Sequence, residues 1–312
     1  MQMPIKSSEI AANIVISGAT GLIGTALCQH LKEKGYHVRQ LVRHRPRSDS
    51  RQEIYWNPDS HFIETAALEN TDVLINLSGE NIGNHRWSSS QRKAILESRV
   101  KSTKLISHAL ARLKTPPRLL INASALGFYG DRGDEEIDEN SKPGLGFLAE
   151  VCRQWENATA EAKQAGISVI HLRSGMVLDT QGGALKKILP WYKAGLGGVI
   201  GSGNQSMSWI SITDAVLAIE HLISIPNLEG PVNLVSPNPV TNKIFCQTLA
   251  KILHRPCAIH ISPLTIRLLF GQMGEELFLH SCKAFPSQLM QSGYVFQHTH
   301  LEEALRSLLS SA

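Results

Sequence analysis

The chain has 312 residues, of which 42% are hydrophobic and 19% are charged, and its formal net charge is +4. This length suits one large domain with a smaller lobe, and the small, dispersed positive charge excludes a nucleic-acid partner. The five cysteines are scattered and the thirteen histidines show no metal-ligand spacing, so we expect reduced thiols and no metal site. The first dozen residues lack a signal-like apolar core, and no apolar run approaches the ~20 residues of a membrane span. We therefore expect a cytoplasmic protein without a membrane partner.

The first predicted element is a strand at Asn13–Ser17, which enters a glycine-rich turn. Three glycines there have distinct roles: a tight turn, a close backbone approach to a pyrophosphate, and close packing of helix on strand. A helix follows through Leu27 and Leu31, and its first N–H groups would face the phosphates. We therefore predict a dinucleotide site that includes Gly18, Thr20, Gly21, Leu22, Ile23 and Gly24.

The second predicted strand, Val38–Val42, indicates which nicotinamide cofactor is bound. In NAD enzymes an acidic residue about 20 positions after the glycine turn binds the ribose 2′-OH. No acid occurs between Val38 and Ser48, where four arginines lie instead: Arg39, Arg43, Arg45 and Arg47. Arg43 directly follows the strand, where a guanidinium can clamp a 2′-phosphate. The sequence therefore favours NADP(H) over NAD(H), with Arg45 or Arg47 expected to be solvated.

Further strands alternate with segments of helical period. The strands are expected at Asp72–Leu77, Arg118–Ala123 and Ser168–Leu172, and the helices at Ser90–Leu113 and Phe147–Ala165. This alternation predicts an α/β fold with a Rossmann-like, doubly wound parallel sheet covered by helices on both faces.

After Arg173 the pattern changes to glycine loops and shorter elements. We expect a helix bearing Leu189, Trp191 and Tyr192, then Asp214–Ser224 with Asp214 capping it, a strand at Pro231–Val235, and helices at Thr241–Leu253, Leu264–Leu269 and Leu301–Leu309. The predicted NADP-binding domain spans residues 13–175 and receives elements from about 205–235. Residues 176–204 and 236–312 would form a smaller C-terminal α/β substrate lobe. Such a lobe would cover a ligand beyond the carboxyl ends of the strands.

Several segments carry a family resemblance. They are the glycine turn, Ile75–Ile82, Arg86-Trp87, Ser98-Arg99, Ser124–Gly130, Trp155-Glu156, Leu172–Gly175, Gly195–Gly203, Trp209–Asp214 and the tail from His254 to Leu309. Over nearly its whole length the chain resembles an extended or atypical short-chain dehydrogenase/reductase. More narrowly, it resembles the "epimerase family protein" subgroup, which carries its own C-terminal domain. The Asn76–Asn81 and Gly195–Gly203 segments are specific to that subgroup, whereas the glycine triplet is not.

The resemblance implies further cofactor contacts. Leu77 and Ser78, with Gly79 after them, would pass the adenosine–ribose side of the cofactor. Arg99 would reach the cofactor from the long helix, and Met176 would lie near the nicotinamide. The alternatives are core packing for Leu77 and a helix-surface charge for Arg99.

The acid–base pair that this family normally uses is absent from the sequence. Short-chain dehydrogenases carry Tyr-x-x-x-Lys on one helix, where the lysine lowers the tyrosine pKa. None of the five tyrosines has lysine four positions later. With the register set by Trp155-Glu156, the tyrosine position holds Leu148 or Phe147, and the lysine position holds Cys152 or Val151.

Three other residues are candidates for the acid–base role. Ser124 lies near the family's usual serine position, although Ala125 fits that position equally well. Tyr129 belongs to a Tyr-Gly turn that mostly shapes the pocket in relatives. Glu80 follows a strand end, and its alternative is structural hydrogen bonding. Cys152 is more typical of a small buried hydrophobe than of a nucleophile.

Three residues are expected at the substrate pocket. Arg86 and Trp87 would form part of its wall or, alternatively, anchor a loop. Arg173 would hold a carboxylate or the sheet edge.

Two functions follow from this sequence. The first is an NADP(H)-dependent oxidoreductase or epimerase acting on an unidentified small polar or sugar-like molecule. The second is a non-catalytic NADP(H)-sensing regulator, as the intact cofactor motifs beside an absent catalytic pair suggest; some relatives carry a division-related label. The resemblance implies a homodimer, with a monomer as the alternative.

Overall fold

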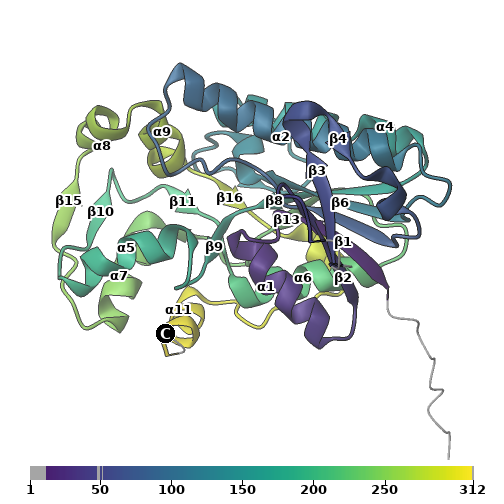
Figure 1. Cartoon of the computed structure of the whole chain (residues 1–312). Helices are drawn as coiled ribbons and strands as arrows, with labels where there is room; N and C mark the ends of the chain where they lie inside the picture. The colour runs from purple at the N-terminus through teal and green to yellow at the C-terminus, as the bar shows by residue number, and fades with distance from the viewer. Residues whose placement is uncertain (1–11, 48–49, 51, 311–312) are drawn as a thin grey trace, which may run out of the picture.

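The computed structural model describes residues 12–47, 50 and 52–310, so the expectation for the start of the chain lies outside these residues. Figure 1 shows a sheet domain with a lobe at one end. None of the described helices is long and apolar enough to cross a membrane. All five cysteines are free thiols.

The central sheet confirms the predicted α/β architecture. Its strands are β1 (Asn13–Ser17), β2 (His37–Val42), β3 (Glu53–Asn57), β4 (Phe62–Ile63), β5 (Val73–Asn76), β6 (Leu119–Ala125), β8 (Ser168–Ser174) and β13 (Gly230–Leu234). Within the described residues their order is β13-β8-β6-β5-β1-β2-β3-β4, and every neighbouring pair except β3–β4 is parallel. The chain winds outward from β1 in both directions, so β1 and β5 flank the switch point at which α/β sheets bind ligands.

Helices cover both faces of this sheet. They are α1 (Leu22–Glu33), α2 (Ser89–Leu110), α3 (Phe147–Asn157), α4 (Ala160–Gln164) and α6 (Ile212–Ser224). Ile14 and Ile16 of β1 pack with α1 and α6, whereas Val15 between them packs with α2 and α4. Strand side chains alternate between faces, so one apolar strand contributes to two cores.

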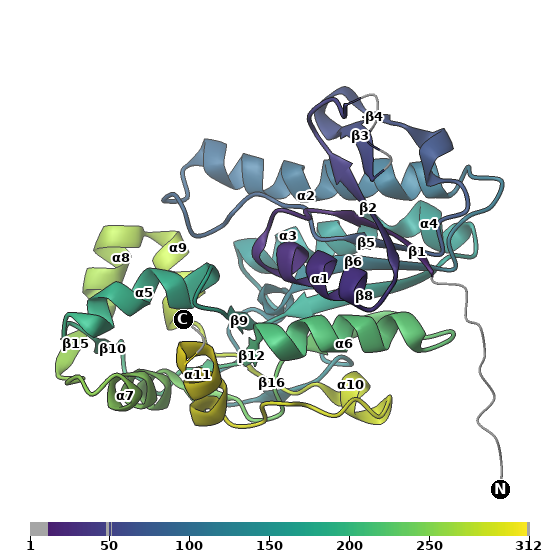
Figure 2. The same ribbon diagram turned by 60° about the horizontal axis from the view of Figure 1, so that its bottom comes forward.

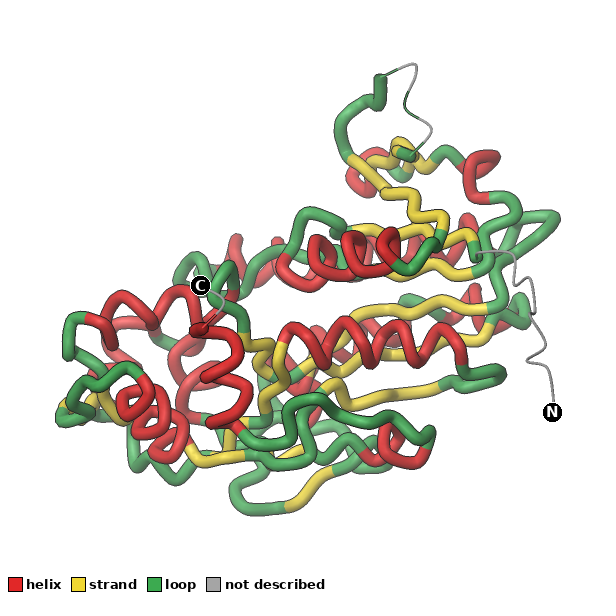
Figure 3. Tube along the Cα trace, turned by 90° about the horizontal axis from the view of Figure 1, so that it is seen from below, coloured by secondary structure: helices red, strands yellow, loops and turns green. Residues whose placement is uncertain are grey.

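The lobe has a core of its own. Its helices are α5 (Gly183–Lys193), α7 (Asn242–Ile252), α8 (Pro263–Phe270), α9 (Gln272–Gly274) and α11 (Leu301–Ser310). Short strands pair as β9 (Met176–Leu178) with β12 (Trp209–Ser211), β10 (Gly198–Ile200) with β15 (Ile259–Ile261), and β11 (Ser206–Met207) with β14 (Val240–Thr241). Apolar faces of α5, α7 and α11 surround Trp209. In Figure 3 these helices gather at one end of the molecule, away from most of the sheet.

Short elements complete the described chain. They are η1 (Pro58–Ser60), η2 (Thr65–Leu68), η3 (Leu126–Tyr129), β7 (Glu136–Ile137), η4 (Glu275–Leu279), β16 (Lys283–Ala284) and α10 (Ser287–Gln291). β7 and β16 pair in parallel.

One predicted helix, Phe147–Ala165, is two helices. α3 ends at Asn157 and α4 begins at Ala160. The Thr159 hydroxyl donates to the Glu156 carbonyl at 2.7 Å and lies 3.0 Å from Nε2 of His171. The hydroxyl thus bonds to a backbone carbonyl that would accept an N–H if the helix continued. This competition favours the break between α3 and α4.

Three further expectations need correction. β3 was not predicted, although the alternation of buried Ile54 and Trp56 with half-buried Tyr55 is a strand signal. The cap of α6 is Ser211, whose hydroxyl accepts from the Asp214 N–H at 3.0 Å; Asp214 lies inside the first turn. Part of the tail assigned to the lobe packs on the sheet domain, since Leu289 lies in the core shared by α1 and α6.

Candidate functional site

The turn between β1 and α1 is tight because its glycines permit it. Gly18 has a φ of +70°, and a Cβ there would lie 2.7 Å from the carbonyl carbon of Leu77. A Cβ on Gly24 would collide with the carbonyl oxygen of Gly18. The start of α1 therefore lies directly against the strand turn and the end of β5.

The N-terminus of α1 is open to an anion. Its N-cap residue, Gly21, brings no side chain to the helix end, and the first turn holds no acidic residue. The N–H groups of Leu22, Ile23 and Gly24 have no acceptor within the helix. Thr20 and Gly21 are exposed. This cradle has the shape and polarity that a dinucleotide diphosphate requires.

At the end of β2, Arg43 is exposed and directly follows the strand. An open hollow beside this strand end is lined by Gln40, His44, Arg45, Arg47, Ser50, Gln52 and Glu53. The Glu53 carboxylate lies 3.5 Å from Nε2 of His44. Arg45 and Arg47 are exposed as well, so three exposed arginines follow the end of β2.

A line of polar side chains connects the carboxyl ends of β1 and β5 to the middle of β6. Ser17 and Ser78 both donate to Oδ1 of Asn76 at 2.6 Å. The Asn76 amide donates to Oδ1 of Asn122 at 2.7 Å and to the Thr103 hydroxyl at 2.9 Å. Sequence reasoning missed Asn76 and Asn122; the available signal was an asparagine in each of two apolar strands, at the end of β5 and in the middle of β6. Ser78 is thereby held where the strand passes the expected cofactor.

Arg99 lies beneath the loop that follows β5. Its Nη1 donates to the carbonyls of Glu80 at 3.0 Å and Ile95 at 3.1 Å, and its guanidinium carbon lies 4.9 Å from the Trp155 ring centroid. A Cβ on Gly79 would lie 3.1 Å from that carbon. Burial lowers the Arg99 pKa from its ordinary value, yet a guanidinium stays charged. The alternative of a freely exposed surface charge is wrong, because Arg99 supports the loop Gly79–Glu80.

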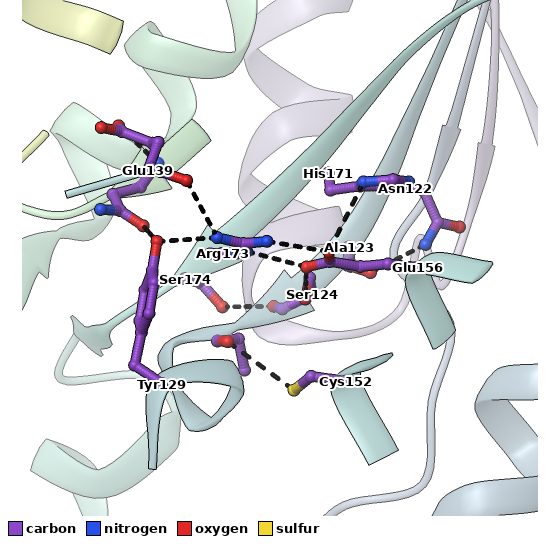
Figure 4. A network of polar contacts seen from close by, with 12 residues as sticks. Asn122, Ala123, Ser124, Tyr129, Glu139, Cys152, Glu156, His171, Arg173 and Ser174 are labelled. Atoms are coloured by element: carbon purple, nitrogen blue, oxygen red, sulfur yellow. Dashed lines mark hydrogen bonds and ion pairs between the residues drawn. The ribbon is translucent and has the colours of Figure 1, made fainter. Parts of the chain in front are cut away.

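Ser124 and Tyr129 lie in a buried network, which Figure 4 shows. Ser124 is 2% exposed and donates to Oε1 of Glu156 at 2.7 Å. The Tyr129 hydroxyl donates to Asn233 at 2.8 Å and accepts from Arg173 at 2.9 Å. Burial is the main cause that raises the pKa of Tyr129 to about 12. Both hydroxyls are engaged in hydrogen bonds inside the protein, and this arrangement counts against either as the group that exchanges a proton with a substrate.

Arg173 is also part of this buried network. It is 4% exposed, and its Nε and Nη2 donate to the two carboxylate oxygens of Glu156 at 2.9 and 3.0 Å. Its guanidinium carbon lies 3.5 Å from the Phe128 ring centroid. The carboxylate-holding alternative for Arg173 is thus the observed one, and Glu156 is the partner that the sequence did not identify.

The positions that align with the family's tyrosine and lysine are apolar. A Cβ on Gly127 would lie 2.9 Å from Cβ of Leu148, so η3 and α3 are in close contact there. Cys152 is 2% exposed, and its thiol lies 3.7 Å from the Ala125 carbonyl. Burial raises the pKa of Cys152 to about 11, which keeps it a thiol at neutral pH.

Glu80 is the acid–base candidate whose carboxylate is uncommitted. Its N–H donates to the Ser98 hydroxyl at 3.0 Å and its carbonyl accepts from Arg99, so the backbone is fixed from two sides. The side chain is half-buried, and within the described chain no hydrogen bond or ion pair engages its carboxylate.

The remaining predicted residues lie at the edge of the site. Trp87 is buried, its indole N–H donates to the Ile82 carbonyl at 2.8 Å, and its ring meets Phe147 edge-on at 5.1 Å. Trp87 therefore anchors the loop, which was its alternative role. Arg86 is exposed, and Met176 is half-buried at the start of β9. No cluster of three or more potential metal ligands occurs in the described part of the chain.

Comparisons with known proteins agree with this geometry. The model of the NAD dependent epimerase/dehydratase family matches residues 14–234, and a domain of unknown function, DUF1731, matches residues 263–308. Epimerase family protein Mb2239 of Mycobacterium bovis is 40% identical over 94% of this chain and 96% of its own length.

Two solved structures share the whole fold. Human epimerase family protein SDR39U1, crystallised with NADPH, superimposes with a TM-score of 0.88 at 30% identity, over 96% of this chain and all of that one. The nucleoside-diphosphate sugar epimerase of Corynebacterium glutamicum superimposes with a TM-score of 0.80 at 34% identity, over 97% of this chain and 59% of that longer one. These matches support a nicotinamide dinucleotide as the occupant of the cradle.

Proposed function

Since this chain belongs to the NAD dependent epimerase/dehydratase family, we propose that it binds NADP(H) and acts as an oxidoreductase or epimerase on a small polar or sugar-like substrate. The observation that carries this proposal is the open cradle formed by the β1–α1 turn, the uncapped start of α1 and the end of β5. We further propose a cytoplasmic location and a homodimer.

The cofactor assignments follow from the positions just described. The N–H groups of Leu22, Ile23 and Gly24 would hold the diphosphate, with Thr20 and Gly21 beside it. Gly18 has no side chain, so the turn can lie close to the end of β5. Leu77, Ser78 and Gly79 would line the adenosine–ribose side, with Arg99 fixing that loop. Met176, which begins the strand after β8, would lie toward the nicotinamide.

NADPH supplies a hydride when it is bound, and a side chain of the protein must then donate or accept a proton. Ser124 and Tyr129 are sequestered, and no Tyr-x-x-x-Lys pair exists in the sequence. Glu80 supports the role of acid or base because its backbone is fixed while its carboxylate stays uncommitted.

The second candidate function is a non-catalytic protein that senses NADP(H). Apolar Leu148 and buried Cys152, which stand where the family places its catalytic pair, favour this alternative. In that case the bound cofactor would stabilise a conformation that a partner protein recognises.

The choice of NADP(H) over NAD(H) can be tested at Arg43. Losing a charge-assisted hydrogen bond to a phosphate is expected to weaken binding by about tenfold to a hundredfold. Arg43→Ala should therefore raise the Kd for NADPH by that factor and leave the Kd for NADH nearly unchanged, as measured by cofactor fluorescence. Equal losses for the two cofactors would contradict the 2′-phosphate assignment.

Catalysis can be tested without knowing the substrate. The protein would be incubated with a metabolite extract and NADPH deuterated at the transferable C4 position, and mass spectrometry would detect any compound that gains deuterium. We expect a labelled product, with Glu80→Gln abolishing the label while NADPH binding persists. Absence of label despite tight NADPH binding would favour the sensor, and full labelling by the variant would remove Glu80 from the mechanism.

A further inference from the structure

Helix α5 of the lobe begins directly on the first turn of α1. A Cβ on Gly182 would lie 2.7 Å from Cδ1 of Leu22, and a Cβ on Gly183 would lie 3.0 Å from Cδ2 of the same side chain. The two glycines thus let α5 start in contact with the helix whose N–H groups face the expected diphosphate. Figure 2 views the molecule with α5 and α7 of the lobe on one side and the sheet domain, with α1, on the other.

About one turn further along α5, Lys187 connects to the opposite flank of the same cradle. Its ammonium donates to the Gly83 carbonyl and to Oδ1 of Asn84, both at 2.9 Å. Gly83 and Asn84 belong to the loop that follows β5, whose first residues line the expected adenosine–ribose side. Helix α5 therefore runs from the start of α1 to the loop after β5, outside the carboxyl ends of the strands.

The loop that Lys187 contacts is ordered at its base and exposed at its tip. Trp87 is buried, and its indole N–H donates to the Ile82 carbonyl. The Asn81 side chain accepts from the Gly83 N–H at 2.8 Å. Gly83 and Asn84 are exposed, as is Lys187. The contact joins an ammonium to two uncharged oxygens at the exposed surface, where water competes for the same groups, so the contact can open and close reversibly.

We propose that Lys187, Gly83 and Asn84 form a latch that closes over the bound cofactor, so that cofactor release requires this contact to open. This proposal rests on the NADP(H) site of the proposed function and adds to it the step that controls exchange. The cofactor lies between the start of α1 and the loop after β5, and α5 with its lysine spans those two flanks. The latch slows dissociation while leaving the diphosphate contacts unchanged.

The test is the dissociation rate of NADPH, measured by stopped-flow fluorescence with an excess of NADP+ as the chase. Lys187→Met should release NADPH about fivefold to tenfold faster than the wild type, with little change in the association rate. Lys186→Met is the matched control, because Lys186 is an exposed neighbour on the same helix and takes no part in the latch. Its dissociation rate should equal that of the wild type.

A second pair of variants separates the latch from a direct phosphate contact. Asn84→Ala should also speed release, and the Lys187→Met/Asn84→Ala double variant should release NADPH no faster than the faster single variant. Unchanged dissociation in Lys187→Met, or an effect of Lys187→Met that Asn84→Ala does not share, would overturn the latch. A wild-type protein that binds no NADPH would instead overturn the proposed function.

Discussion

Glu156 is a single carboxylate that joins three elements of the sheet domain. It accepts from Ser124 of β6 and, through both oxygens, from Arg173 of β8, while it belongs to α3 itself. His171 adds a fourth side chain, with Nδ1 at 3.7 Å from Oε2 of Glu156. Removing one partner of a buried pair leaves the other charge uncompensated, which costs about 3–5 kcal/mol. Ser124 and Arg173, which the sequence offered for the site, thus connect β6 and β8 to α3 through Glu156.

The same cluster predicts a pH dependence of stability. Burial is the main cause that lowers the pKa of His171 to about 4, from an ordinary value of 6.5. Between these values the unfolded chain binds a proton that the folded protein does not, so stability is full above pH 6.5 and falls as the pH drops toward 4. This term should remove about 2 kcal/mol between pH 7.5 and 5.

Urea unfolding of His171→Gln at the two pH values checks this expectation. The variant should lose less stability on acidification than the wild type, by about that amount. His37→Gln is the control, since His37 is exposed at the start of β2. Identical acid losses in wild type and His171→Gln would contradict the assignment.

At the scale of elements, Asp214 ties the C-terminal segment to α6. Its fully buried carboxylate accepts from the Ser211 hydroxyl at 2.9 Å and the Tyr294 hydroxyl at 2.9 Å. It also accepts from the N–H groups of Gln297 at 2.7 Å and His298 at 2.9 Å. One acidic side chain thus stabilises the start of a sheet-domain helix and holds the C-terminal segment at Tyr294, Gln297 and His298.

Asp214→Ala should destabilise the protein by about 3 kcal/mol or more, because it leaves buried donors without an acceptor. Hydrogen exchange should show faster exchange at Gln297 and His298 before global unfolding. Glu303→Ala, an exposed site on α11, should change the stability by no more than about 0.5 kcal/mol. Unaltered exchange at the two amides would contradict the tie.

At the scale of the whole molecule, the lobe also caps a helix of the sheet domain. Both oxygens of Glu276 accept backbone N–H groups at the start of α3, from Phe147 at 3.0 Å and Leu148 at 2.8 Å. The N-cap of α3 is a glycine without a capping side chain of its own. The helix that carries the family's catalytic positions therefore depends on the lobe for its N-terminal hydrogen bonds.

The sequence predicted the sheet, the glycine turn and most helices because their signals are local. Strand runs, helical period and glycine spacing are all read within a few residues, and the structure has them nearly where expected. Contacts such as Glu276 with Phe147 join residues 129 positions apart, and no local pattern encodes them. The partners of Ser124 and Tyr129 were missed for the same reason, since only the fold reveals that Glu156 and Asn233 accept hydrogen bonds from their hydroxyls.

The order of the strands has a consequence for synthesis of the protein on the ribosome. β13, the last strand of the sheet, is contributed by residues 230–234, and Leu289, Tyr294 and Phe296 pack on the core that it completes. A nascent chain that has emerged only as far as β8 has an unpaired strand edge and an uncovered apolar face. The sheet domain can close only when the chain has been translated as far as Phe296, so the partly made chain is the form most prone to aggregate and most dependent on chaperones.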